Sequence, residues 1–162
     1  MLCRAEEIEG SITEARGFEL DADQYAASLL MPRFLFVPAA DLIKNKPPWS
    51  IAEALAAQFQ TSLLATALRM IALDVWPGWL VCHTRHGRPF CFKAPSVDDI
   101  GRPPLAVDYR SAAFDVVHAN ASGLHARKVA GDVWFAAAKH RIAMEYARAY
   151  PPERVLTFVR LL

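Results

Sequence analysis

Residues 18–32 read Phe18-Glu19-Leu20-Asp21-Ala22-Asp23-Gln24-Tyr25-Ala26-Ala27-Ser28-Leu29-Leu30-Met31-Pro32. The carboxylates of Glu19 and Asp23 are four residues apart, so a helix places both on one face. Apolar residues follow at helical spacing and predict one amphipathic helix over residues 18–31 with a buried stripe. The stripe consists of Ala22, Tyr25, Ala26, Leu29 and Leu30. Pro32 restricts the residue before it and is expected to end the helix.

This stretch resembles the E-x-x-A-[ND]-x-[FY]-A-x-x-L-L-M-P signature of the ImmA/IrrE-type zinc metallopeptidases. The resemblance implies that Glu19 is the third protein ligand of a zinc ion. In that family the other two ligands are histidines of an H-E-x-x-H helix earlier in the chain, and its glutamate is the general base. A carboxylate at Asp23 is placed to accept a hydrogen bond from a ligating histidine and to orient it. The implied activity is regulatory endopeptidase cleavage of a helix-turn-helix repressor.

The sequence departs from that family in one respect, because no H-E-x-x-H occurs in its 162 residues. One interpretation is the carboxyl-terminal part of such a peptidase, not catalytically competent as this chain alone. Its full-length relative would hold zinc, whereas one carboxylate cannot retain the ion by itself. The missing helix would then lie upstream of a start codon assigned too late, or on another polypeptide. The alternative is a non-catalytic relative in transcriptional or stress regulation, which binds a protein such as a repressor through the surface left exposed.

Composition and charge limit the binding partners and the cellular location that can be expected for this protein. A net charge of +1 creates no strong field for nucleic acid or an anionic membrane. No run of eighteen apolar residues suggests a membrane span, and the start of the chain lacks the apolar core of a signal peptide. The cysteines, Cys3, Cys82 and Cys91, are too few for a four-thiolate zinc site. We therefore expect a cytoplasmic protein with no membrane partner. A protein partner is what the resemblance implies, and the sequence leaves the oligomeric state open.

The order of patterns predicts an α+β fold, with helices first and an antiparallel β-rich region after them. Residues 1–76 are expected to be the helical remnant of a metallopeptidase-like domain, and residues 77–162 a β-rich region packed on it. Residues 33–40 are interpreted as a buried connector. Two helices resembling a helix-turn-helix pair are expected at residues 51–59 and 63–73. Ser50 and Glu53 form a capping-box pattern before the first of them.

Nucleic-acid binding by this helical pair is not expected. A recognition helix needs basic side chains to reach phosphates and bases. Residues 62–73 offer only Arg69, so the pair is interpreted as a packing element.

In the second half, strands are expected at residues 79–84 and 88–93, joined by a turn at His86-Gly87. This register would place Cys82 opposite Cys91. A loop is expected at 95–110, a strand at 114–118, a loop at 119–127, and strands at 129–135, 142–146 and 155–162. Successive strand residues point to opposite faces, so Cys82 and His83 are not expected to share a metal. The remaining histidines are interpreted as ordinary surface or hydrogen-bonded residues; they are His118, His125 and His140.

Overall fold

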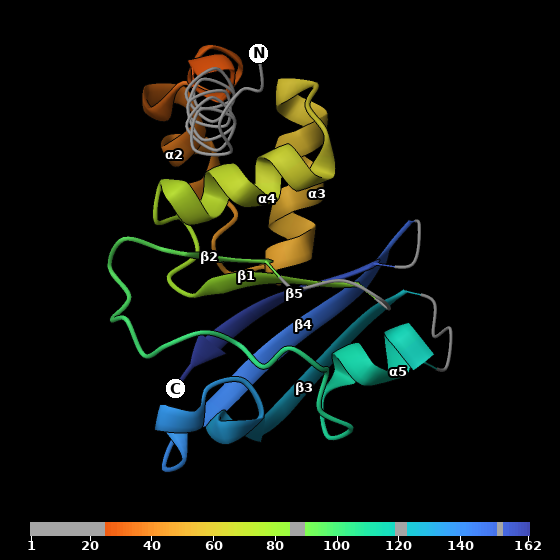
Figure 1. Cartoon of the computed structure of the whole chain (residues 1–162). Coiled ribbons are helices and arrows are strands. Elements are labelled where there is room, and N and C mark those ends of the chain that lie inside the picture. Colours follow the sequence, from red (N-terminus) through yellow and green to blue (C-terminus); the bar gives the residue numbers. More distant parts are fainter. Residues whose placement is uncertain (1–24, 85–89, 119–122, 152–153) are drawn as a thin grey trace, which may run out of the picture.

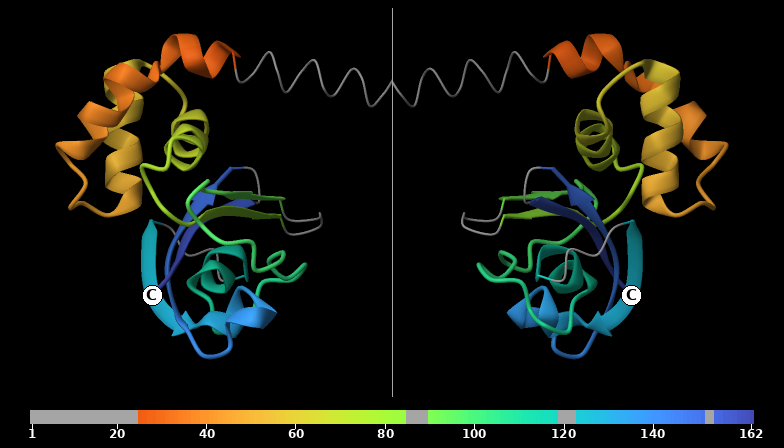
Figure 2. Two further views of the ribbon diagram at one scale, coloured as in Figure 1. Left: turned by 90° about the vertical axis from the view of Figure 1, so that its left-hand side faces the viewer. Right: turned by 90° about the vertical axis from the view of Figure 1, so that its right-hand side faces the viewer.

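The computed structural model describes residues 25–84, 90–118, 123–151 and 154–162. In this part of the chain, helices come first and a five-stranded antiparallel sheet follows (Figure 1), which confirms the predicted α+β class. Helices α2, α3 and α4 lie over one face of the sheet, while α5 and two short 3₁₀ helices lie on the other (Figure 2). No helix among the described residues is long and apolar enough to cross a bilayer.

The helical region contains one more helix than the sequence suggested. Residues 25–30 are helical, and α2 (Arg33–Asp41) follows after a two-residue break. Pro32 has extended backbone angles, and its carbonyl accepts hydrogen bonds from the amides of Leu35 and Phe36. The proline therefore ends one helix, as predicted, and begins the next. The predicted buried connector at residues 33–40 is wrong, since proline favours the start of a helix as well as its end.

The expected helical pair is present as α3 (Pro48–Phe59) and α4 (Leu63–Ala72). Helix α3 begins at Pro48, so the predicted capping role of Ser50 is wrong. A proline at the first helical position loses no hydrogen bond, because that amide has no partner within the helix. The side chain of Ser62 caps α4 instead, accepting a hydrogen bond from the amide of Ala65 at 3.2 Å.

The sheet has the order β2-β1-β5-β4-β3 and is antiparallel throughout. Its strands are β1 (Trp79–Thr84), β2 (Phe90–Lys93), β3 (Leu124–Ala130), β4 (Ile142–Tyr150) and β5 (Arg154–Leu161). Strands β1, β2, β4 and β5 overlap the strands predicted at 79–84, 88–93, 142–146 and 155–162. Strand β5, the last strand in the sequence, thus lies in the middle of the sheet, between β1 and β4. This position explains why β5 is buried over most of its length.

The register of the first hairpin differs from the prediction by one residue. Cys91 pairs with Val81, and Cys82 pairs with Phe90. A slip of one residue moves a side chain to the opposite face of the sheet. The predicted pairing of Cys82 with Cys91 is therefore wrong, and the predicted turn residues His86 and Gly87 lie outside the described part of the chain.

The segment between residues 112 and 138 differs most from the prediction. Helix α5 (Ala112–His118) replaces the strand expected at 114–118, and β3 occupies much of the loop expected at 119–127. The strand expected at 129–135 ends early, because η1 (Gly131–Val133) and η2 (Ala136–Ala138) make a compact turn there. The expected loop at 95–110 contains no helix or strand, as predicted.

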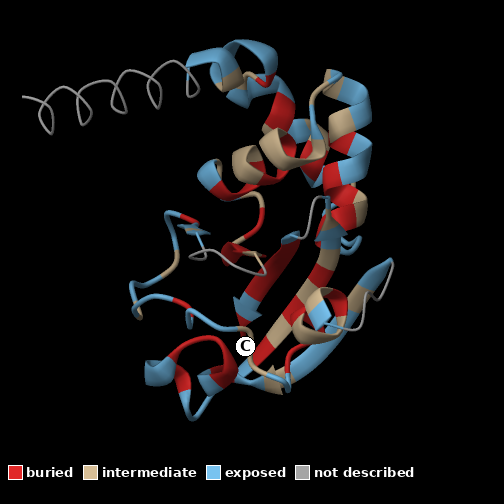
Figure 3. Cartoon of the chain, turned by 45° about the vertical axis from the view of Figure 1, so that its right-hand side comes forward, coloured by how far each residue is buried: buried red, intermediate tan, exposed pale blue. Residues whose placement is uncertain are grey.

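Two apolar cores lie on the two faces of the sheet (Figure 3). Between the sheet and the helices, the Trp49 ring packs 4.7 Å from the Phe158 ring, and its indole N–H donates to the Tyr146 carbonyl at 2.7 Å. On the other face, the Trp79 ring lies 4.6 Å from the Phe135 ring. Each tryptophan joins a strand to a separate segment, so the sheet holds the helices and the turn together.

Candidate functional site

The predicted zinc helix is described only from residue 25 onward. Glu19 and Asp23 lie outside the described residues, and their roles as zinc ligand and orienting carboxylate stay predictions. Where the helix is described, the predicted buried stripe is wrong. Leu29 and Leu30 are 65% and 60% exposed, because residues 25–30 extend beyond the body formed by the other helices (Figure 2).

Met31 is the anchor of this segment. Its side chain is buried, and the hydroxyl of Thr61 lies 3.6 Å from its sulfur. The Arg69 guanidinium donates from Nε to the Met31 carbonyl at 3.0 Å. Burial lowers the pKa of Arg69, and the charge of Arg33 lowers it further. Arg69, the only basic residue of α4, thus holds the Met31 segment against this helix. The contact agrees with a packing role for α4.

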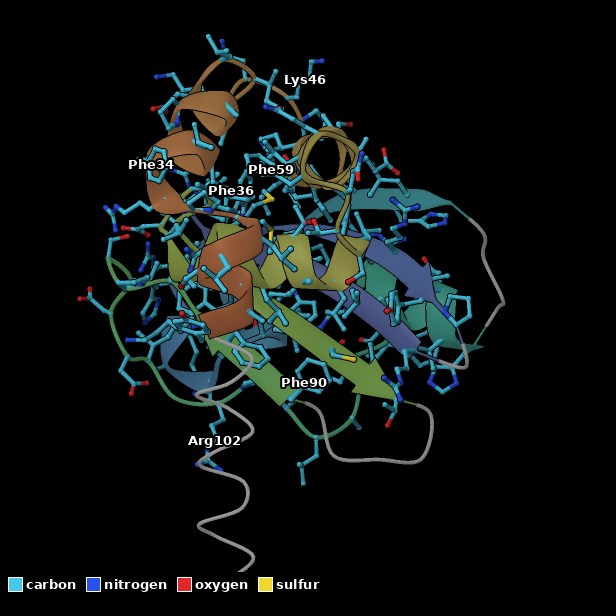
Figure 4. All side chains as sticks on the ribbon, turned by 90° about the horizontal axis from the view of Figure 1, so that it is seen from above. Phe34, Phe36, Lys46, Phe59, Phe90 and Arg102 are labelled. Carbon is cyan, nitrogen blue, oxygen red and sulfur yellow. The ribbon has the colours of Figure 1, made fainter. Side chains whose placement is uncertain are left out.

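Exposed apolar side chains gather on the segment that precedes and begins α2. We call them the outer apolar set: Tyr25, Leu29, Leu30, Phe34 and Leu35. All of them are at least 52% exposed. In Figure 4, Phe34 lies on the outside, whereas Phe36 points toward Phe59, with ring centroids 5.3 Å apart. Neighbouring large apolar residues at the surface are typical of a region that another polypeptide covers.

A buried carboxylate lies on the opposite face of the sheet. The Glu145 side chain on β4 is completely buried and accepts three hydrogen bonds. Its Oε2 accepts from the Ser111 hydroxyl and the Trp134 indole N–H, both at 2.7 Å. Its Oε1 accepts from the Ala112 amide at 2.5 Å. These three donors come from the start of α5 and from the turn after η1, so one carboxylate joins both segments to the sheet.

Opposing effects act on the ionisation of Glu145. Burial raises the pKa of its carboxyl, while the Ala112 amide, the Ser111 hydroxyl, the indole of Trp134 and the charge of Arg127 oppose that rise. Both oxygens of the carboxylate accept hydrogen bonds from protein groups, and the side chain is shielded from solvent. This arrangement is that of a structural buried carboxylate rather than an acid presented to a substrate.

Sequence reasoning missed Glu145, although a signal for it exists. Residues Ala143, Glu145 and Ala147 alternate along a strand whose neighbouring positions carry larger side chains. Period-two alternation puts these three on one face, and the alanines indicate that this face is closely covered. A glutamate there needs donors, and the indole of the buried Trp134 needs an acceptor.

His83 is the other buried titratable group on this face. Its Nε2 lies 3.2 Å from the Pro104 carbonyl, and its ring centroid is 5.7 Å from that of Trp134. Its Nδ1 has no hydrogen-bond partner among the described residues. Burial lowers the pKa of His83, and the hydrogen bond to Pro104 partly offsets this. The imidazole is therefore held neutral beside the loop that follows β2.

The two described cysteines are poor candidates for reactive thiols. Burial raises the pKa of Cys82, although the charge of Arg154 opposes the rise, and burial raises the pKa of Cys91 to about 11. Metal binding and nucleophilic attack both need the thiolate. Cys82 is fully buried and Cys91 half-buried, and both are free.

The described residues do not fit a zinc site by themselves. Within residues 25–84, 90–118, 123–151 and 154–162, no three His, Cys, Asp or Glu side chains come together as a metal-binding group. His118 ends α5 and stacks with Phe114 at 4.3 Å, His125 lies on β3, and His140 follows η2. We therefore derive no catalytic step through zinc from these residues.

Comparison of the chain with protein-family models and with curated protein sequences gave no match.

Proposed function

We propose that this chain is the carboxyl-terminal part of an ImmA/IrrE-like zinc metallopeptidase, a regulatory endopeptidase acting on a helix-turn-helix repressor. In this proposal Glu19 completes a zinc site with two histidines of an H-E-x-x-H helix that these residues do not contain, and Asp23 orients one histidine. The chain alone would then be neither catalytically competent nor able to retain zinc. The signature at residues 19–32 carries the proposal.

The outer apolar set supports the expected docking of another segment beside the Glu19 helix. Leu29 and Leu30 belong to the signature, yet the described helices leave them exposed. Met31 and Pro32, which end the signature, are fixed by the hydrogen bonds to α2 and from Arg69. The segment is thus held firmly at one end, while its apolar side chains remain available for a second helix.

A zinc measurement on a longer protein tests this proposal. The in-frame sequence upstream of Met1 is translated, and a segment with H-E-x-x-H is expressed joined to the chain. We expect close to one zinc per protein. The Glu19→Ala variant should hold much less zinc, whereas the matched Glu14→Ala variant should hold as much as the unaltered protein. Retention of zinc by Glu19→Ala would contradict the assigned ligand.

The alternative is a non-catalytic protein-binding relative in transcriptional or stress regulation. The same exposed apolar set favours it, since a binding surface needs no metal. Absence of H-E-x-x-H upstream and in neighbouring reading frames would select this alternative. Incubation with a purified helix-turn-helix repressor of the same organism then separates the two: a peptidase cleaves it in a chelator-sensitive manner, and a binding protein forms a complex without cleavage.

In the binding alternative, Leu30→Glu should weaken the complex by roughly tenfold or more, because it puts a charge into an apolar contact. The matched variant Ala54→Glu changes another exposed helical position outside the outer apolar set. An equal effect of both substitutions would exclude the outer apolar set as the binding surface.

A further inference from the structure

Helices α2, α3 and α4 leave part of the sheet face beneath them uncovered. Strand β3 is the outer strand on one side of the sheet (Figure 2), and it is exposed over most of its length (Figure 3). Leu124 at the start of β3 is 44% exposed, and Ile142 at the start of the adjoining β4 is 52% exposed. This region is separate from residues 19–32, on which the proposed function depends.

The strand register shows which side chains of this region lie on the helix side of the sheet. The Arg160 guanidinium carbon lies over the ring of Trp76, 5.8 Å from its centroid, and Trp76 belongs to the core under the helices. Met144 on β4 pairs with Arg160 on β5 and with Lys128 on β3. Directly opposite residues of antiparallel strands share a face. Lys128, Met144 and Arg160 therefore form one row across three strands on the helix side.

Residues two positions along the same strands extend this row into a surface, because alternate strand residues share a face. We call this surface the open sheet face: Leu124, Ala126, Lys128, Ile142, Met144 and Arg160. Met144 is half-buried and the other five residues are exposed. The open sheet face thus combines four apolar side chains with two cations.

The two cations of the open sheet face have no anionic partner among the described residues. None of the ion pairs formed there includes Lys128 or Arg160. The described residues of the five strands include one carboxylate, Glu145, and it lies on the opposite face of the sheet. The surface is therefore apolar and positively charged, which favours a partner with apolar groups and carboxylates.

The contact between α3 and the sheet shows how a helix can meet such a cation. Arg148 lies on β4, four residues after Met144 and on the same face, and it pairs with Glu53 of α3. Its guanidinium carbon also lies 5.8 Å from the centroid of the Trp49 ring at the start of α3. A further helix beside α3 would extend the same layer over β4 and β3. Acidic side chains on that helix would pair with the free cations as Glu53 pairs with Arg148.

Two other occupants fit the open sheet face less well. Two copies of the chain stacked through this face would bring the cations of one copy toward those of the other, and like charges repel. Single-stranded nucleic acid needs exposed aromatic rings on which its bases stack. Tyr146, the next residue of β4 on this side, is half-buried, and its ring lies against that of Trp76 with 5.7 Å between centroids.

We propose that the open sheet face binds a helix of a protein partner that carries a stripe of apolar side chains with carboxylates beside it. The apolar stripe packs on Leu124, Ile142 and Met144. The carboxylates pair with Lys128 and Arg160. The bound helix lies beside α3 and continues the helical layer over β4 and β3.

The experiment is a titration of the ¹⁵N-labelled 162-residue chain with a capped helical peptide of about 16 residues, which has a leucine stripe flanked by glutamates. A second peptide has glutamine in place of each glutamate. We expect saturable shifts of the Lys128, Met144 and Arg160 amide signals with the glutamate peptide, and at least about tenfold weaker binding of the glutamine peptide. Equal binding of both peptides, no shift at about 1 mM, or shifts confined to Leu29 and Leu30 overturns the proposal. Tighter binding of an oligothymidylate to the same amides would assign the face to nucleic acid and also overturns it.

Matched variants separate this face from general surface charge. Lys128→Glu and Ile142→Gln should each weaken binding of the glutamate peptide at least about tenfold, because one reverses a pairing charge and the other removes apolar contact. Arg102→Glu makes a similar reversal of charge at an exposed position of the loop that follows β2, the strand at the opposite edge of the sheet (Figure 4). It should change the affinity less than about twofold.

An equal loss of affinity in Lys128→Glu and Arg102→Glu overturns the proposal. Self-association of the chain that Lys128→Glu abolishes would assign the face to a second copy, which also overturns it. Retained signals elsewhere in the spectrum show that each variant is folded.

Discussion

Trp134 donates its indole N–H to the carboxylate of Glu145 at 2.7 Å, and neither side chain reaches solvent to a significant degree. Trp134 follows η1 in the turn before β4, while Glu145 lies in the middle of β4. The same carboxylate accepts from Ser111, whose hydroxyl in turn accepts from the Ala113 amide inside α5. On the face of the sheet that carries α5, the Glu145 carboxylate thus holds both the start of α5 and the turn containing Trp134.

Replacing Glu145 by alanine should destabilise the fold by about 3 kcal/mol, because it leaves buried donors of Ser111, Ala112 and Trp134 without an acceptor. Urea unfolding followed by tryptophan fluorescence measures the change. Glu53→Ala is the matched control, since Glu53 forms an exposed ion pair with Arg148 that contributes about 1 kcal/mol or less. Similar losses in both variants would contradict the central role of Glu145.

Stability should also depend on pH through Glu145. Its pKa in the folded protein is raised by burial above the usual 4.5. A raised folded pKa means that the folded state binds the proton more tightly, so this contribution to stability is complete below about pH 4.5 and is lost as pH rises through the folded pKa. Glu145→Gln should remove this part of the pH dependence. A series of unfolding curves between about pH 4 and pH 8 measures it, and an unchanged profile in the variant would count against the shift.

The contribution of His83 to stability should depend on pH in the opposite direction to that of Glu145. Burial lowers its pKa below 6.5, so the unfolded chain takes up a proton more readily than the folded one. Its contribution is therefore complete above about pH 6.5 and is lost as pH falls through the folded pKa. His83→Phe keeps a ring beside Trp134 but removes the titration, so the decline in stability on acidification should become shallower. A steeper decline in His83→Phe than in the wild-type protein would be incompatible with a neutral buried imidazole.

The elements that the sequence predicts correctly are those whose local pattern and tertiary position agree. Strand β5 is rich in β-branched and aromatic residues and lies in the middle of the sheet, and α4 has a capping serine at Ser62. Helix α5 shows the reverse case, since Val116 and Val117 favour a strand locally. Its helix is instead fixed by the Ser111 cap and by the packing of Ala112 over Glu145. The contacts of Ser111 and Ala112 with Glu145 join residues more than thirty positions apart, which a local pattern does not reveal.

The candidate sites also differ in whether a local sequence pattern or a tertiary contact defines them. The resemblance of residues 19–32 to a zinc-peptidase signature could be identified from the sequence alone, because these residues are contiguous. Glu145, Ser111 and Trp134 become a group only when the sheet brings them together. The exposure of Leu29 and Leu30 was not predictable either, because helical periodicity identifies an apolar face but not the element that covers it.

That exposure leads to a prediction on stability within the signature itself. Leu29→Ala and Leu30→Ala should each change the unfolding free energy of the chain by less than about 0.5 kcal/mol, because both side chains are mostly solvated. Met31→Ala should cost about 2–5 kcal/mol, since it opens a cavity between α2 and α4 where the sulfur contacts Thr61. Urea unfolding of the three variants under one set of conditions provides the comparison. A loss of more than about 2 kcal/mol in Leu29→Ala or Leu30→Ala would mean that these leucines are covered in solution, by a second copy or by another part of the chain. Repeating the measurement at tenfold lower protein concentration separates these two cases, because only association between copies depends on concentration.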